Sequence, residues 1–79
     1  MIRLLWFAGL AEAAGVREET RPLEAPIPLA SLWNDLVRDR PGLKGQPRPA
    51  FARNGKAARA DDRAEPGDTI ALLPPVSGG

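Results

Sequence analysis

The apolar residues at the start of the chain predict a first β-strand over residues 2–7, IRLLWF. Ile2, Leu4 and Trp6 alternate with the other positions, so their side chains share one face of this strand. Leu5 and Phe7 place large apolar side chains on the opposite face as well. This second face must therefore be covered by the protein itself or by another molecule.

The next two segments have the composition of a short helix and of an edge strand. Residues 8–14, AGLAEAA, are mostly strong helix formers, and Gly15 suits the left-handed conformation that follows a helix end. Residues 16–24 begin with an alternating pattern that predicts a strand, which Pro22 weakens or ends. The charged side chains of this segment favour a place at the edge of a sheet, where charge discourages unwanted pairing.

A stripe of apolar residues at helical spacing predicts the main helix. Pro28 is tolerated in the first turn of this helix, and Pro41 forces Arg40 out of helical geometry and ends it. No Ser, Thr, Asp or Asn stands at the cap position, so the helix begins without a side-chain cap. The stripe consists of Leu29, Leu32, Trp33, Leu36 and Val37.

The last third of the chain reads as a hairpin, a turn and a final strand. Asn54 and Gly55 lie between two weak strand candidates and both tolerate the positive φ of a type I′ turn. Residues 61–68, DDRAEPGD, have turn composition, and residues 69–75, TIALLPP, predict a strand followed by two prolines. In that strand Ile70 and Leu72 would face the core, and Thr69, Ala71 and Leu73 would face outward.

These elements predict an α+β fold, with a mixed sheet of about five strands crossed by one main helix and a short helix after the first strand. The simplest topology makes the first and last strands parallel neighbours in the middle. It places Leu5, Phe7, Ala71 and Leu73 together on the face that the main helix leaves free. Either loops and the short helix cover these side chains, or they form an exposed apolar patch of the kind that marks a partner. We expect one domain over residues 1–74 and a tail over residues 75–79.

Composition excludes several classes of function. The chain has 79 residues, too few for a deep enzyme pocket, and it lacks His and Cys, which removes the usual transition-metal ligands and nucleophilic relays. A net charge of +1 without a basic run does not favour nucleic acid, and no apolar run is long enough to span a bilayer, so we expect a cytoplasmic protein. We assign no metal, because Asp61, Asp62 and Asp68 are better explained as turn formers, and we place Trp6 and Trp33 in the core.

The final residues, PPVSGG, have the properties of a slender projecting tail. Pro74 and Pro75 hold the chain extended, Val76 offers an apolar foothold, and Ser77, Gly78 and Gly79 are small enough to enter a narrow passage. The terminal carboxylate is an anion at neutral pH and a poor electrophile until it is joined to AMP with ATP, after which an amine, a thiol or a sulfide donor can displace AMP. The alternative is a frayed terminus without a chemical role.

Four stretches of the sequence together resemble the small subunits of molybdopterin synthase, a family of ubiquitin-like sulfur carriers. They are the opening IRLLWFAGLAEAAG, the NG hairpin, the segment PGDTIALL and the tail PPVSGG. The resemblance covers nearly the whole chain, and the tail is its most specific part, since the related carriers of thiazole synthesis end in Gly-Gly but usually lack the double proline.

The resemblance implies a β-grasp fold and a role for the chain end in sulfur transfer. In this family an enzyme related to ubiquitin-activating enzymes consumes ATP to adenylate the terminal carboxylate, here that of Gly79, which then becomes a thiocarboxylate. The tail inserts into the large synthase subunit, in a complex of two copies of each subunit, and the sulfur passes to cyclic pyranopterin monophosphate. The carrier holds no stable cofactor and is not catalytic alone. The outward Leu5, Phe7 and Leu73 lie where such carriers meet their partners.

One residue departs from the family pattern, and two other functions stay open. Arg53 stands where an apolar residue is common in the family, so the hairpin register or a partner contact can differ there. The chain could instead donate sulfur to thiazole or cysteine synthesis, or act as a protein modifier joined to lysines through Gly79. The double proline at Pro74 and Pro75 favours the molybdopterin pathway.

Overall fold

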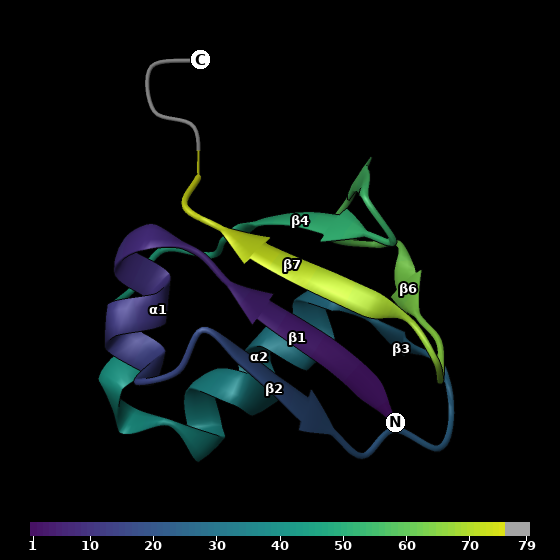
Figure 1. Ribbon diagram of the computed structural model, residues 1–79, viewed down its shortest axis with the longest axis horizontal. Coiled ribbons are helices and arrows are strands. Elements are labelled where there is room, and N and C mark those ends of the chain that lie inside the picture. Colours follow the sequence, from purple (N-terminus) through teal and green to yellow (C-terminus); the bar gives the residue numbers. More distant parts are fainter. Residues whose placement is uncertain (76–79) are drawn as a thin grey trace.

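The centre of the fold is a parallel pair of strands from opposite ends of the chain. The computed structural model describes residues 1–75 and contains a mixed five-stranded sheet in the order β2-β1-β7-β4-β5, in which β1 and β7 run parallel (Figure 1). The predicted fold class and the central parallel pair are confirmed. The elements are β1 (Ile2–Trp6), α1 (Ala8–Ala14), β2 (Glu18–Arg21), β3 (Ile27–Pro28), α2 (Leu29–Asp39), the 3-10 helix η1 (Pro41–Leu43), β4 (Ala50–Arg53), β5 (Lys56–Ala58), β6 (Arg63–Ala64) and β7 (Thr69–Leu73).

Helix α2 packs against one face of this sheet and forms the core with it (Figure 1). Trp6 and Trp33 are both buried, as predicted, and the expected stripe faces inward except for Val37, which is only partly buried at its edge. The core contains the buried side chains of Ile2, Leu4, Trp6, Leu10, Leu29, Leu32, Trp33, Leu36, Leu43, Phe51, Ala64, Ile70 and Leu72.

The start of α2 is stabilised by backbone groups in place of a side-chain cap. Its N-cap residue is Pro28, which makes no side-chain hydrogen bond. The N–H of Leu29 donates to the carbonyl of Asp62 at 2.8 Å, and the N–H of Ala30 donates to that of Ala60 at 2.9 Å. These bonds satisfy two of the donors that a helix leaves free at its first turn.

Two short features of the chain were not predicted. A second sheet pairs β3 with β6, because residues 27–28 and 63–64 meet at the edge of the core. The 3-10 helix η1 packs against α1, where Gly42 is required because a Cβ there would overlap the carbonyl oxygen of Ala13. The predicted first strand also ends one residue early, since Phe7 becomes the N-cap of α1.

Arg40 joins the ends of α1, α2 and β2. Its guanidinium donates to the carbonyl oxygen of Ala14 at 2.6 Å, forms an ion pair with Glu19, and lies 5.6 Å from the centre of the Trp6 ring. The carbonyl of Ala14 is one of those that α1 leaves without an intrahelical partner. Arg40 therefore fixes the position of α1 relative to the sheet.

Arg53 lies directly before the predicted two-residue hairpin turn. Arg53 pairs with Lys56 across a two-residue turn, in which Asn54 and Gly55 have φ values of 51° and 84°. The guanidinium of Arg53 turns toward the residues that precede β7, and its Nε lies 2.6 Å from Oδ2 of Asp68. Arg53, the residue that departs from the family pattern, thus has a local structural role, since it binds the turn before β7.

Asp68 is the centre of this contact and is almost completely buried. Besides Arg53, it accepts hydrogen bonds from the side chain of Asn54 at 3.0 Å and from the N–H of Glu65 at 2.8 Å. Burial alone would raise the pKa of Asp68, but the hydrogen bonds from Asn54, Glu65 and Arg53 outweigh it and hold the pKa below its usual range. The charged form of Asp68 is therefore favoured in the folded protein.

We expect Asp68 to make the domain sensitive to acid. A lowered folded-state pKa contributes stability above the unfolded value of about 3.9, and this contribution is lost as the pH falls through the folded-state pKa. Asp68→Asn should lower the free energy of unfolding by about 2 kcal/mol at pH 7 and should reduce its loss on acidification. Urea unfolding at pH 7 and at acidic pH measures both effects, with the exposed Asp61→Asn as the control. An unchanged pH dependence in Asp68→Asn would contradict this assignment.

Candidate functional site

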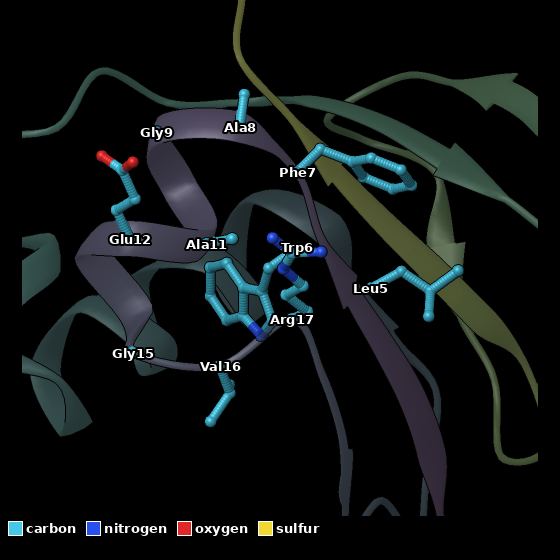
Figure 2. A pocket seen from close by; sticks show the side chains of 10 residues that line it. All are labelled: Leu5, Trp6, Phe7, Ala8, Gly9, Ala11, Glu12, Gly15, Val16 and Arg17. Carbon is cyan, nitrogen blue, oxygen red and sulfur yellow. The ribbon is translucent and has the colours of Figure 1, made fainter.

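The sheet face opposite α2 carries the apolar residues predicted to meet a partner. Leu5 pairs with Ala71 in neighbouring strands, and Leu5 and Phe7 point to the same side of β1 (Figure 2). Leu5, Ala71 and Leu73 are half-buried, whereas Phe7 is 43% exposed. Neither α1 nor a loop among residues 1–75 covers these side chains completely, so the structure favours the exposed patch over the covered alternative.

Three alanines extend the patch and were missed in the sequence. Ala52 pairs with Ala71, Ala50 pairs with Leu73, and Ala57 pairs with Ala52 on the outer strand. Paired residues of neighbouring strands share a face, so the register places these alanines beside the predicted residues. The hairpin signal together with the alternation in β4 could have identified them. We call the whole set the apolar face: Leu5, Phe7, Ala50, Ala52, Ala57, Ala71 and Leu73.

The other end of the same sheet face is polar. Arg3 pairs with Thr69 on β7 and with Thr20 on β2, and its Nε donates to Glu18 at 2.8 Å. The face thus changes from polar to apolar along the direction of β1 and β7. A partner that binds apolar side chains would contact the end at which β7 terminates.

Phe7 is an exposed aromatic residue on a fixed backbone. Its N–H donates to the carbonyl of Leu72 at 3.2 Å, and its carbonyl accepts from the N–H of Leu10 at 3.1 Å. Ala8, which follows it, has a φ of 50°, a left-handed conformation that costs a residue with a Cβ about 1 kcal/mol. A backbone that is fixed before binding loses little entropy on binding, so Phe7 is suited to anchor a partner.

The chain leaves the sheet at the apolar end of this face. β7 ends at Leu73, and both Pro74 and Pro75 are exposed (Figure 1). The predicted tail residues Val76, Ser77 and Gly78 and the predicted reactive Gly79 lie outside the described residues. The two prolines thus continue from the strand that carries Ala71 and Leu73.

Asp62 and Asp68 act as turn formers, as predicted. Oδ2 of Asp62 accepts from the N–H of Arg59 at 2.7 Å, and Asp68 binds Glu65 and Arg53 as described above. Residues 1–75 contain no group of three or more His, Cys, Asp or Glu side chains placed to hold a metal ion. Neither do they contain a helix with the length and apolar character needed to cross a membrane.

Comparison with known proteins gives a consistent set of relatives. A sequence model of the ThiS family matches residues 4–79. The chain is 35% identical to the human molybdopterin synthase sulfur carrier subunit, over 99% of this chain and 93% of that protein. It is 33% identical to small archaeal modifier protein 1 of Haloferax volcanii, over 92% of this chain and 94% of that protein. The crystal structure of that archaeal protein superposes with a TM-score of 0.78 at 31% identity, covering 99% of this chain and 98% of the other.

Proposed function

The chain belongs to the ThiS family, and on this basis we propose that it is the sulfur carrier subunit of a molybdopterin synthase. The observation that carries the proposal is the junction between the apolar face and the exposed Pro74 and Pro75. A partner seated on that face would lie beside the point at which the tail leaves the sheet. The human relative, named as a sulfur carrier subunit of that enzyme, supports the same role.

The proposed chemistry takes place at the carboxylate of Gly79. In the first step a carboxylate oxygen attacks the α-phosphorus of ATP, pyrophosphate leaves, and an acyl adenylate forms on an activating enzyme of the ubiquitin-activating type. A sulfur donor then attacks the acyl carbon and displaces AMP, which leaves a terminal thiocarboxylate. ATP is thus a substrate of the partner enzyme, and the carrier needs no stably bound cofactor.

In the second step the tail enters the large subunit of the synthase. The thiocarboxylate sulfur attacks a carbon of cyclic pyranopterin monophosphate and displaces an oxygen substituent from it. Hydrolysis of the resulting thioester leaves the sulfur on the pterin and returns the carboxylate of Gly79, and a second loaded carrier supplies the other sulfur of the dithiolene. The large subunit supplies the catalytic side chains, in a complex with two copies of each subunit. The carrier contributes the sulfur atom and the apolar face, and it is not an enzyme by itself.

A second candidate function is protein modification. It is favoured by the similarity to small archaeal modifier protein 1 in both sequence and structure. In that case an acceptor lysine amine, in place of sulfur, would displace AMP from the Gly79 adenylate and form an isopeptide bond. The two functions differ in the atom attached to the terminal carbonyl, so intact-mass spectrometry of protein from its native cell separates them.

The decisive test is reconstitution of sulfur transfer. Thiocarboxylated protein is mixed with the large subunit from the same genome and with cyclic pyranopterin monophosphate, and the dithiolene product is measured. We expect product in proportion to the thiocarboxylate supplied and none from the carboxylate form. Absence of product from a fully thiocarboxylated sample would reject the molybdopterin role, and isopeptide adducts on cellular proteins would support the modifier role.

A further inference from the structure

A groove lies between α1 and the sheet, next to the apolar face (Figure 2). It has a volume of about 920 Å³. Trp6 forms its floor, and Phe7 and Val16 provide apolar walls that are 43% and 37% exposed. Leu5 and Phe7 also belong to the apolar face, so the two surfaces are continuous.

The groove contains a cation without a partner. Arg17 has an exposed side chain that extends into the groove, and it makes no ion pair or side-chain hydrogen bond with residues 1–75 (Figure 2). Glu12 on α1 is the nearest acidic residue of the groove lining, but its carboxylate points away from Arg17. The backbone of Arg17 is fixed, since its carbonyl accepts from the N–H of Trp6 at 2.8 Å. The base of this side chain is therefore fixed at the groove, and its guanidinium is available to bind an anion.

A second donor, beneath the surface of the groove, also lacks an acceptor. The indole Nε1 of Trp6 is buried, lies toward the segment formed by Gly15 and Val16, and has no hydrogen-bond partner among residues 1–75 (Figure 2). Arg40 lies over the ring of Trp6 but is itself a donor, already bound to Ala14 and Glu19. Because the Trp6 nitrogen is buried, a ligand in the groove does not meet it, and Arg17 is the donor that an oxygen ligand would contact there.

We propose that the groove receives a carboxylate, from an Asp or Glu adjoining an apolar side chain, of the protein that docks on the apolar face. The guanidinium of Arg17 would bind the carboxylate through paired N–H groups, and the adjoining apolar side chain would pack on Phe7 and Val16. A protein partner is favoured over a free small molecule because the groove is continuous with the apolar face. The proposal rests on the proposed function, in which this partner is the large subunit of the synthase.

The test is a charge reversal at Arg17, with binding of the large subunit from the same genome measured by titration calorimetry. Arg17→Glu should raise the dissociation constant at least tenfold, because it places a carboxylate on the carrier beside the carboxylate of the partner. Arg17→Lys keeps the charge without the planar fork and should lose only part of the affinity. Raising the salt concentration should weaken wild-type binding more than binding of Arg17→Ala.

Arg63→Glu is the matched control, since Arg63 is exposed on β6 at the opposite end of the molecule and makes no ion pair among the described residues (Figure 1). It should bind like the wild type. If Arg17→Glu binds within twofold of the wild type, or if Arg63→Glu is weakened equally, the groove assignment is wrong and the proposed function stands. If the wild type does not bind the large subunit at all, the proposed function fails and the groove proposal fails with it.

Discussion

Deletion of Gly79 is expected to abolish sulfur loading and to leave the domain folded. The deletion moves the terminal carboxylate back by about 3.5 Å along an extended chain, and a misplacement of about 1 Å can already cost a factor of about 100 in rate. The described core lies between Ile2 and Leu72, and Pro74 and Pro75 are exposed, so the free energy of unfolding should change by less than about 0.5 kcal/mol. Intact-mass spectrometry after incubation with the activating enzyme, ATP and a sulfur donor measures the loading.

The control for this deletion is Ser77→Ala, which keeps the length of the tail and removes one hydroxyl group. It should load sulfur at a rate close to that of the wild type. Loading of the deletion variant at the wild-type rate would show that the terminal carboxylate of Gly79 is not the acceptor. It would then remove the basis of the proposed function.

Leu73→Glu is expected to give the second large effect, on docking of the large subunit. Leu73 is half-buried at the apolar end of the sheet face, beside Ala50 and directly before Pro74. A carboxylate enclosed there without a partner would cost about 3 kcal/mol, which corresponds to a loss of affinity of roughly a hundredfold. The dissociation constant measured by titration calorimetry tests this expectation.

Thr69→Glu provides the matched control for the docking variant. Thr69 lies on the same strand and the same face but at its polar end, beside Arg3. A carboxylate there should stay solvated and leave the affinity nearly unchanged. Equal losses in both variants would indicate a general charge effect, and an unchanged affinity of Leu73→Glu would mean that the partner uses another surface.

Local patterns in the sequence were sufficient for most of the fold. Residues 8–14 were predicted to be a helix, and α1 has these bounds, with Gly15 left-handed at a φ of 83°. The hairpin at Asn54 and Gly55 and the inward-facing Ile70 and Leu72 were also confirmed. Helix composition, turn dipeptides and alternation act over a few residues, so they can be read without knowing the rest of the structure.

The parts of the fold that were not predicted from the sequence depend on contacts between distant segments. β3 and β6 are two residues each, too short to show alternation, and they exist because Ile27 meets Ala64 across the fold. The bonds of Arg40 to Ala14 and Glu19 likewise join segments more than 20 residues apart. The groove beside Arg17 is set by the position of α1, which the alternation of β1 cannot specify.

The candidate site was predictable in outline and not in extent. The alternation of β1 and β7 identified Leu5, Phe7, Ala71 and Leu73. In two neighbouring parallel strands, residues that pair with each other point to the same face of the sheet. To predict that β4 and β5 add alanines to the apolar face, one needs the strand register, in which Ala50 lies opposite Leu73. The placement of Gly79 against a partner remains a prediction.

The central position of β7 also bears on biosynthesis. β1 and β4 do not pair with each other, so until β7 emerges from the ribosome the described strands can form only the separate pairs β1–β2, β3–β6 and β4–β5. Isolated two-stranded sheets are marginal in water, and sheets that join distant segments form slowly. The strand that completes the fold is thus the one that leads directly into the tail. A translating ribosome would hold the carrier unfolded until that strand is free, and nascent chains would be open to chaperones and proteases during this interval.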